Sequence, residues 1–167
     1  MSQAESEPAS TGGRAPEAVA LFNVALTSEL FVNACWHKQQ HGVRGLSWPA
    51  AFVVLPLTLH PLTRATLPTK STVSLAGWAV RHPDLIADMD HRVATMVTPT
   101  KRAIRHGIRA GRLRLDGTDL VATARPRNPT KVWPAELTEA VRAARICGRW
   151  FNVIEVQSAF ELLGIGS

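Results

Sequence analysis

Cys35, His37 and His41 form a C-x-H-x3-H pattern, and their thiolate and imidazole groups are side chains that zinc prefers as ligands. His37 and His41 are one helical turn apart, so the two rings share a face of a helix. Cys35 lies about 200° from His37 around the same helix. The three groups cannot meet at one ion while the helix stays intact. We therefore predict no metal site here, and the spacing of the other histidines indicates none either.

A second candidate for chemistry is the acidic group Asp84, Asp88 and Asp90, which suggests a hydrolase or metal cluster. Asp84 follows Pro83, where a carboxylate simply favours the start of a helix. No phosphate-binding loop, nucleophile elbow or zinc signature occurs in the chain. The sequence predicts no catalytic residue, no metal and no cofactor, and therefore a protein that is not an enzyme.

The most uneven feature of the chain is its charge. The chain has 19 Lys and Arg and 13 Asp and Glu, a net charge of +6, and residues 99–131 alone hold nine bases and two acids. If residues 99–110 are helical, a rotation of about 100° per residue places the bases within roughly a 100° arc, with Ala, Gly and Ile opposite. The bases of this face are Lys101, Arg102, Arg105, Arg109 and Arg112. Such a face, with no acid in it, indicates a surface for nucleic acid.

A β-hairpin is predicted directly after this basic helix. Arg112 and Arg114 alternate with Leu113 and Leu115, and the Asp116-Gly117 pair is a strong turn signal. Helices, a basic helix and a hairpin are the order of a winged helix-turn-helix, whose exposed helix enters the major groove. We predict nucleic-acid binding by Lys101, Arg102, Arg105, Arg109, Arg112 and Arg114. Two alternatives stay open: a solvated helix face, and a winged helix that docks a protein.

The remaining elements that must position these residues are helical. Apolar residues at three- and four-residue steps predict helices over residues 18–42, 72–81, 84–97, 134–151 and 155–163. A buried helix is predicted from Ser47 as cap, with Pro49 in its first turn and Pro56 ending or kinking it. Thr98 and Pro99 predict the start of the basic helix, and Gly111 its end. The predicted fold class is mainly α with a small β-hairpin, a helical domain containing a winged helix-turn-helix-like element.

The predicted organisation is a disordered acidic tail (1–17) and a single, mostly helical domain (18–167). The domain contains a winged-helix-like segment (72–125) and C-terminal helices (134–167). The longest apolar run, residues 49–59, is too short to cross a bilayer. Two cysteines give no disulfide framework, so we expect a cytoplasmic protein without a membrane partner.

Four stretches occur in an order that resembles a known family. They are "LFNVALTSELFVNAC", "GLSWPAAFVVLPLTLHPLTRATLP", "TKRAIRHGIRAGRLRLDGTDLV" and "ARICGRWFNVIEVQSAFELLGI". Together they resemble the middle component of bacterial three-component ABC-ATPase conflict systems over residues 20–166. The resemblance implies a small non-enzymatic subunit that works with an SMC/Rad50-like ABC ATPase and an effector, often nuclease-like, in defence against phage or plasmids.

The leading hypothesis is an adaptor that binds the ABC ATPase and helps the assembly to engage DNA or to restrain the effector. We predict that its partner surface includes Phe22, Asn23, Leu26 and Glu29, although an Asn at a helix start is also a common cap. The alternative is a stand-alone winged-helix transcription regulator, which predicts a dimer and two half-sites about one DNA turn apart. An uncharacterised enzyme is a third reading, supported only by scattered His and Asp residues.

Overall fold

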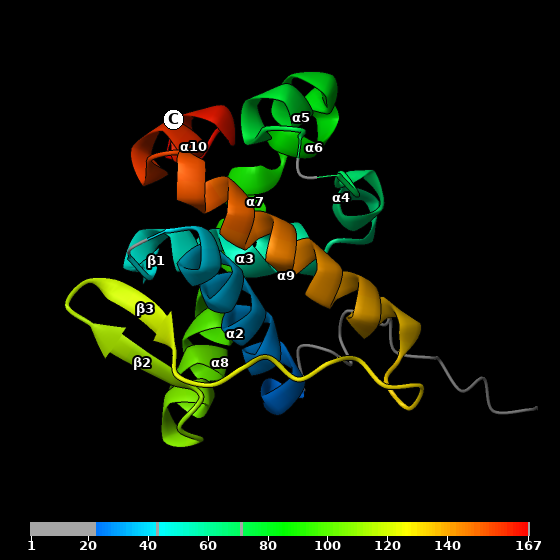
Figure 1. The fold of residues 1–167 in the computed structure, drawn as a ribbon. Coiled ribbons are helices and arrows are strands. Elements are labelled where there is room, and N and C mark those ends of the chain that lie inside the picture. The colour runs from blue at the N-terminus through cyan, green and yellow to red at the C-terminus, as the bar shows by residue number, and fades with distance from the viewer. Residues whose placement is uncertain (1–22, 43, 71, 167) are drawn as a thin grey trace, which may run out of the picture.

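The computed structural model describes residues 23–42, 44–70 and 72–166. These residues form helices around one hydrophobic core and a small antiparallel sheet at one side, so the predicted mainly α class is confirmed (Figure 1). The elements in chain order are α2 (Val24–His41), β1 (Leu46–Ser47), α3 (Trp48–Leu59), α4 (Pro61–Thr66), α5 (Leu75–Arg81), α6 (Pro83–Ala87), α7 (Met89–Thr95), α8 (Val97–Arg109), β2 (Leu113–Asp116), β3 (Asp119–Ala122), α9 (Ala135–Val153) and α10 (Val156–Leu162). The predicted tail, residues 1–17, lies outside the described residues.

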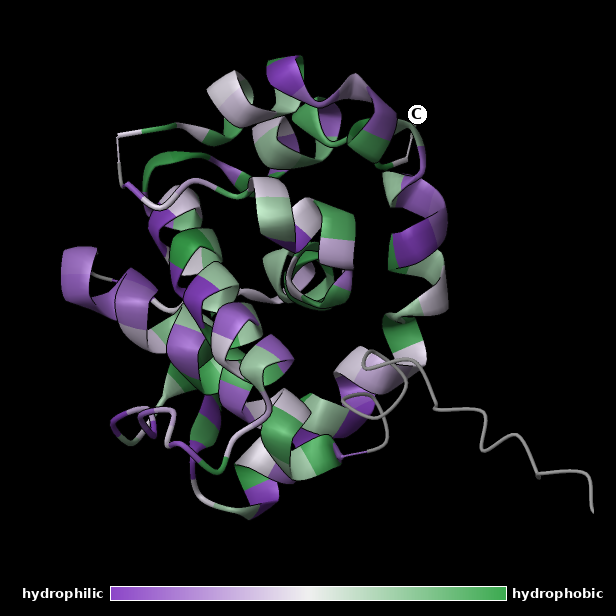
Figure 2. Ribbon diagram, turned by 90° about the vertical axis from the view of Figure 1, so that its right-hand side faces the viewer, coloured by the Kyte–Doolittle hydropathy of each residue, from purple (hydrophilic) through white to green (hydrophobic). Residues whose placement is uncertain are grey.

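Helix α2 is the element on which the others are assembled. It packs most extensively against α9 and next against α8, and it also contacts β3 and α3. A Cβ atom on Gly148 of α9 would collide with the backbone oxygen of Ala34, so glycine allows the two helix backbones to approach closely. Figure 1 shows α9 (orange) crossing α2 (blue). In Figure 2, green and purple bands alternate along most helices, as expected for helices with one buried face.

The sheet has three strands in the order β1-β3-β2, all antiparallel. The hairpin pairs Leu113 with Ala122 and Asp116 with Asp119, so Gly117 and Thr118 form its turn, and Gly117 has a φ of 60°. The predicted hairpin is confirmed. The pairing of β1 with β3 was not predicted, because a two-residue strand has no alternation to detect.

Helix α3 is apolar and almost wholly buried, as predicted, but Pro56 does not end it. The helix continues to Leu59 because burial of the residues around Pro56 outweighs the cost of about 3 kcal/mol for an interior proline. Ser47 stands at the N-cap position, yet its side chain makes no capping hydrogen bond.

Two buried arginines close the C-terminal end of α3. Nη1 of Arg64 donates to the carbonyl oxygens of Thr58 (3.2 Å) and Leu59 (3.1 Å), and Nη1 of Arg92 donates to that of Pro56 (3.1 Å). The last carbonyls of a helix have no partner within the helix, so the guanidinium groups satisfy them inside the core. Helix α3 is thereby tied to α4 and α7.

The helix predicted over residues 84–97 is divided into α6 and α7 at Asp88. In a continuous helix the carbonyl of Leu85 would accept from the amide four residues later. Here that carbonyl accepts from Nη2 of Arg92 instead. Helix α8 begins at Val97, so Thr98 is not its cap, contrary to prediction; Pro99 lies in the first turn, where a missing N–H costs little. Gly111, with a φ of 67°, ends the helix as predicted.

The other helix ends lie within about two residues of their predicted positions, whereas α2 begins at Val24 and α5 at Leu75, later than the predicted starts at residues 18 and 72. Asn23 caps α2 and Ser74 caps α5, Gly42 follows the last residue of α2, and Gly164 follows α10 with a φ of 66°. In α9, the buried face includes Leu137, Val141, Ala144 and Ile146. Among the described residues, no helix combines the length and the apolar character needed to cross a membrane.

Candidate nucleic-acid interface

Helix α8 separates its apolar and basic residues onto opposite faces. Thr100, Ala103, Ile104 and Gly107 are buried. The bases on the other face are exposed, and we call them the α8 stripe: Lys101, Arg102, Arg105 and Arg109. Within the described part of the chain, no carboxylate forms an ion pair with any of these four. The α8 stripe therefore presents uncompensated positive charge to solvent.

Close packing holds α8 rigidly on α2 and on the hairpin. A Cβ atom at Gly107 would lie 2.7 Å from Oγ of Ser28 and 2.5 Å from Cδ1 of Leu113. Only a glycine at this position allows α8 to approach both neighbours so closely. The apolar face of α8 is thus fixed against α2, and the α8 stripe points away from the core.

Arg112 was predicted to extend the basic face, and the structure corrects this placement. Its Nη2 lies 2.6 Å from Oε1 of Glu29 and its Nε lies 3.2 Å from Oε2, a bidentate ion pair. Nη2 also donates to the carbonyl oxygen of Arg125 (3.1 Å). Its guanidinium is therefore occupied within the fold, where it fastens the start of the hairpin to α2.

Glu29 was predicted to belong to a partner surface, but it is only 4% exposed. Besides Arg112, its Oε1 accepts from the backbone N–H of Arg127 at 2.6 Å. One carboxylate thus joins α2, the residue before β2 and the loop after β3. Because its acceptors are used inside the fold, Glu29 has a structural role in place of the predicted one.

The hairpin keeps one of its two predicted arginines on the surface. The side chain of Arg114 is 58% exposed and lies 3.8 Å from Asp116, a surface pair of little energetic weight. Leu113 is buried. Leu115, which its alternation with the arginines places on the same side of the strand, is 48% exposed because β2 extends past the core toward the turn. The hairpin tip therefore carries an arginine beside an exposed leucine.

The other residues of the predicted partner surface lie at the start of α2. Phe22 lies outside the described residues. Asn23 is the N-cap, and its Oδ1 accepts from the N–H of Leu26 at 3.2 Å. The side chain of Leu26 packs partly against the core.

The cysteine and histidine pattern does not assemble a site. Burial raises the pKa of the Cys35 thiol above its ordinary range and that of Cys147 to about 12, so both are inert thiols at neutral pH. Among the described residues, no three His, Cys, Asp or Glu side chains are placed to hold a metal. Asp88 lies 3.7 Å from Arg92, and Asp90 accepts from the N–H of Gly166 at 3.1 Å.

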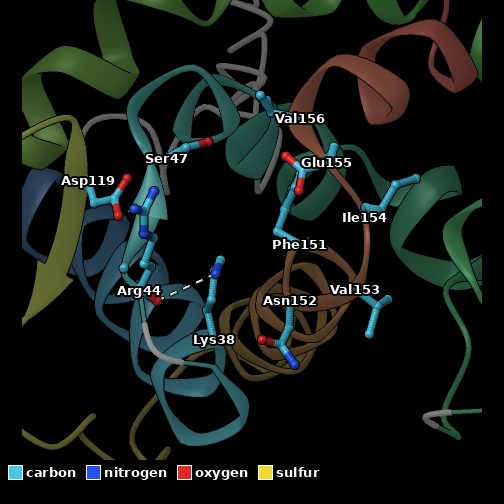
Figure 3. A pocket seen from close by; sticks show the side chains of 11 residues that line it. Lys38, Arg44, Ser47, Asp119, Phe151, Asn152, Val153, Ile154, Glu155 and Val156 are labelled. Carbon is cyan, nitrogen blue, oxygen red and sulfur yellow. Dashed lines mark hydrogen bonds between the residues drawn. The ribbon is translucent and has the colours of Figure 1, made fainter.

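A cavity of about 250 Å³ that the sequence did not indicate lies beside β1 and the end of α9. Figure 3 shows the amine of Lys38 in it, donating to the carbonyl oxygen of Arg44 at 3.4 Å. Two cations, Lys38 and Arg44, and two carboxylates, Asp119 and Glu155, line it. The balanced charge gives this cavity no preference for an anion, whereas the α8 stripe has one.

Comparison with known proteins was made at three levels. A family model described as "ABC-three component (ABC-3C) system Middle Component 3" matches residues 11–167. This match covers nearly the whole chain and confirms the resemblance found in the sequence. Neither the curated proteins nor the solved structures that were compared contain a match to the chain.

Proposed function

Because the chain belongs to the Middle Component 3 family of ABC-three component systems, we propose that it is a non-catalytic adaptor subunit of its system. In this proposal it binds the SMC/Rad50-like ABC ATPase, links it to an effector protein such as a nuclease, and serves bacterial defence. The observation that carries the proposal is the family match over residues 11–167. The inert, buried cysteines and the dispersed acids of α6 and α7 support a role without catalysis.

We further propose that the α8 stripe contacts the DNA backbone. The elements α2, β1, α3, α8, β2 and β3 follow the order of a winged helix-turn-helix, with α4 to α7 inserted between α3 and α8. The proposal takes α2 and α3 as the first helices of the motif, in place of those in residues 72–97, because β1 pairs with β3 and α8 packs on α2. The α8 stripe then occupies the face that such a motif turns toward the duplex.

The adaptor role is tested by co-purification with the ABC ATPase of the same three-component system. We expect a tagged full-length chain to co-elute with that ATPase in size-exclusion chromatography, at a constant ratio across the peak. A chain that elutes as a monomer while the ATPase is present in excess would contradict the proposal. A chain that carries Lys70→Ala and Arg81→Ala should co-elute as well, because both residues are exposed and lie away from α8. This variant shows that the loss of two surface charges alone does not abolish the association.

A stand-alone winged-helix regulator is the second candidate, and the same element order favours it. That function requires a self-complementary dimer that reads two half-sites about one DNA turn apart. An elution volume that shows a dimer without the ATPase, together with protection of a palindromic site, would favour the regulator over the adaptor.

A further inference from the structure

A second group of bases lies between α2 and α9, away from the α8 stripe. On α9, Arg142, Arg145 and Arg149 recur at steps of three and four residues and share one face. His37 and His41 are one turn apart on α2 and act electrostatically on each other, as do Arg145 and Arg149 on His37. We call these five residues the α2–α9 basic cluster.

The α2–α9 basic cluster has no acidic partner within the described residues. Among the described residues, none of its three arginines forms an ion pair with a carboxylate. Glu139, on the same helix, is turned toward Arg64, 3.4 Å away. The cluster therefore differs from Arg112, Arg64 and Arg92, each of which has a carboxylate close by.

Within the part of the chain that the structure describes, two nitrogen atoms of the cluster are buried and lack an acceptor. Nη1 of Arg142 and Nε of Arg149 are shielded from solvent without a hydrogen bond, whereas Nε of Arg145 donates to Oδ1 of Asn33 at 3.0 Å. A buried donor without a partner destabilises the structure that contains it. An incoming carboxylate would supply acceptors to guanidinium groups that α9 already holds side by side.

The pKa of His37 responds to the positive charges around its ring. Burial, followed by the charges of Arg145, Arg149 and His41, lowers the pKa of His37 to about 4. These are the charged groups that act on the ring from α9 and from α2. A bound anion offsets the part of this shift that comes from the neighbouring positive charges, so the pKa of His37 should rise when the site is filled, while the effect of burial remains.

We propose that the α2–α9 basic cluster is a docking site for an acidic, Asp- or Glu-bearing segment of a partner protein. The α2–α9 basic cluster lies apart from the proposed DNA contact. Ser28 of α2 faces α8, whereas the backbone of Ala34, roughly 120° away around α2, contacts α9. The carboxylates of such a segment would pair with the guanidinium groups of the cluster through charge-assisted hydrogen bonds. The proposal rests on the proposed function only in that the chain works with partner proteins.

The test uses the full-length chain and a fluorescent hexaglutamate peptide, measured by anisotropy at constant ionic strength. We expect Arg142→Gln with Arg149→Gln, which keeps the bond between Arg145 and Asn33, to lower the affinity at least tenfold. Arg102→Gln with Arg105→Gln removes the same charge from the α8 stripe and should change the affinity less than twofold. Thermal melts confirm that both variants fold. Equal losses in the two variants, or no loss in the first, would overturn the proposal.

A duplex DNA probe distinguishes the two classes of macromolecule. If the α9 variant loses DNA and peptide binding to the same extent, the cluster serves nucleic acid and the proposal is wrong. Since the assay contains no ATPase, failure here leaves the co-elution result for the adaptor role standing.

Protonation of His37 gives an independent measurement. The pKa of His37 is lower in the free chain than in the complex, so binding takes up a proton and tightens as the pH falls between the two values. From pH 7.5 to 5.5, where glutamates stay mostly ionised, the affinity should therefore rise. His37→Gln should remove most of that rise. An NMR titration in which peptide leaves the pKa of His37 unchanged would overturn the proposal.

Discussion

At the scale of single residues, the polar groups that matter most are buried and work in pairs. Glu29 accepts three hydrogen bonds, two from Arg112 and one from the backbone of Arg127. Taking both charges out of water is costly, and their attraction offsets that cost only when the geometry is good. The pair therefore sets where the hairpin and the following loop attach to α2, rather than adding much net stability.

Breaking this pair should be costly, because the remaining charge stays buried. We expect Glu29→Gln to lower the free energy of unfolding by about 3 kcal/mol. Glu139→Gln, whose side chain is 59% exposed opposite Arg64, should lower it by less than about 1 kcal/mol. Urea denaturation of both variants measures the difference. Similar losses in the two variants would mean that Glu29 is not the anchor described.

No sequence pattern could have revealed this ion pair. Glu29 and Arg112 are 83 residues apart, and a helical projection shows only that Arg112 lies near the other bases of residues 101–109. The projection continued the helix past its end at Arg109, so it placed Arg112 on an exposed face. The α2–α9 basic cluster was missed for a different reason. Residues 132–167 hold three arginines and four glutamates, so this segment has no excess of positive charge, although the three- and four-residue spacing of the arginines was visible.

At the scale of elements, the fold depends on how closely α2 and α9 approach. The contact between Gly148 and the backbone of Ala34 involves no side chain that could move aside. Helix α9 thereby presents Arg145 and Arg149 beside His37, and it also packs on α3. A change in the spacing of α2 and α9 would therefore disturb both the core and the α2–α9 basic cluster.

A methyl group at position 148 tests this dependence. Gly148→Ala should lower the free energy of unfolding by about 1–3 kcal/mol or more, because the two backbones must separate. Gly77→Ala is the matched control in α5: its Cβ would come no closer than 3.3 Å, to the side-chain oxygen of Ser74. Alanine is favoured over glycine in helices by about 0.5–1 kcal/mol, so the control should be neutral or stabilising. A neutral Gly148→Ala variant would show that the crossing tolerates a wider separation.

The long elements were predictable because periodicity and caps agree along them. Helix α9 shows its buried face in the spacing of Leu137, Val141 and Ala144, and the hairpin shows its turn in Asp116-Gly117. The structure differs from the prediction where a residue distant in the sequence forms a hydrogen bond with the backbone. Strand β1 exists only because β3 pairs with it, and α6 and α7 separate where Arg92 takes the carbonyl of Leu85. Contacts between distant residues decide these features, and a local pattern does not contain them.

At the scale of the whole molecule, α2 keeps two basic surfaces apart. The α8 stripe and the α2–α9 basic cluster are borne by helices that pack on different faces of α2. A subunit with two such surfaces can engage a duplex and an acidic protein segment at the same time. This arrangement is the one that the proposed adaptor needs.

The proposed contact with DNA leads to a prediction about the assembled complex. The α8 stripe is all Lys and Arg, and no Asn or Gln between residues 99 and 127 is available to read adenine, so binding should occur through phosphates and be largely independent of sequence. Each phosphate contact contributes about 0.9 to the slope of log affinity against log salt concentration. Arg105→Ala with Arg109→Ala should lower the affinity and reduce the slope by roughly 1.8.

The measurement is the affinity of the complex with the ATPase for duplex DNA at a series of salt concentrations. Lys70→Ala with Arg81→Ala removes the same charge from the region of α5 and should leave the slope unchanged. If the slope of log affinity against log salt concentration is unchanged in the α8 variant, the α8 stripe does not contact DNA. If that variant instead loses the ATPase while the remaining DNA binding keeps its slope, α8 docks on an acidic protein surface. Arg105 and Arg109 are exposed and do not contribute to the hydrophobic core, so either outcome reports on binding rather than on folding.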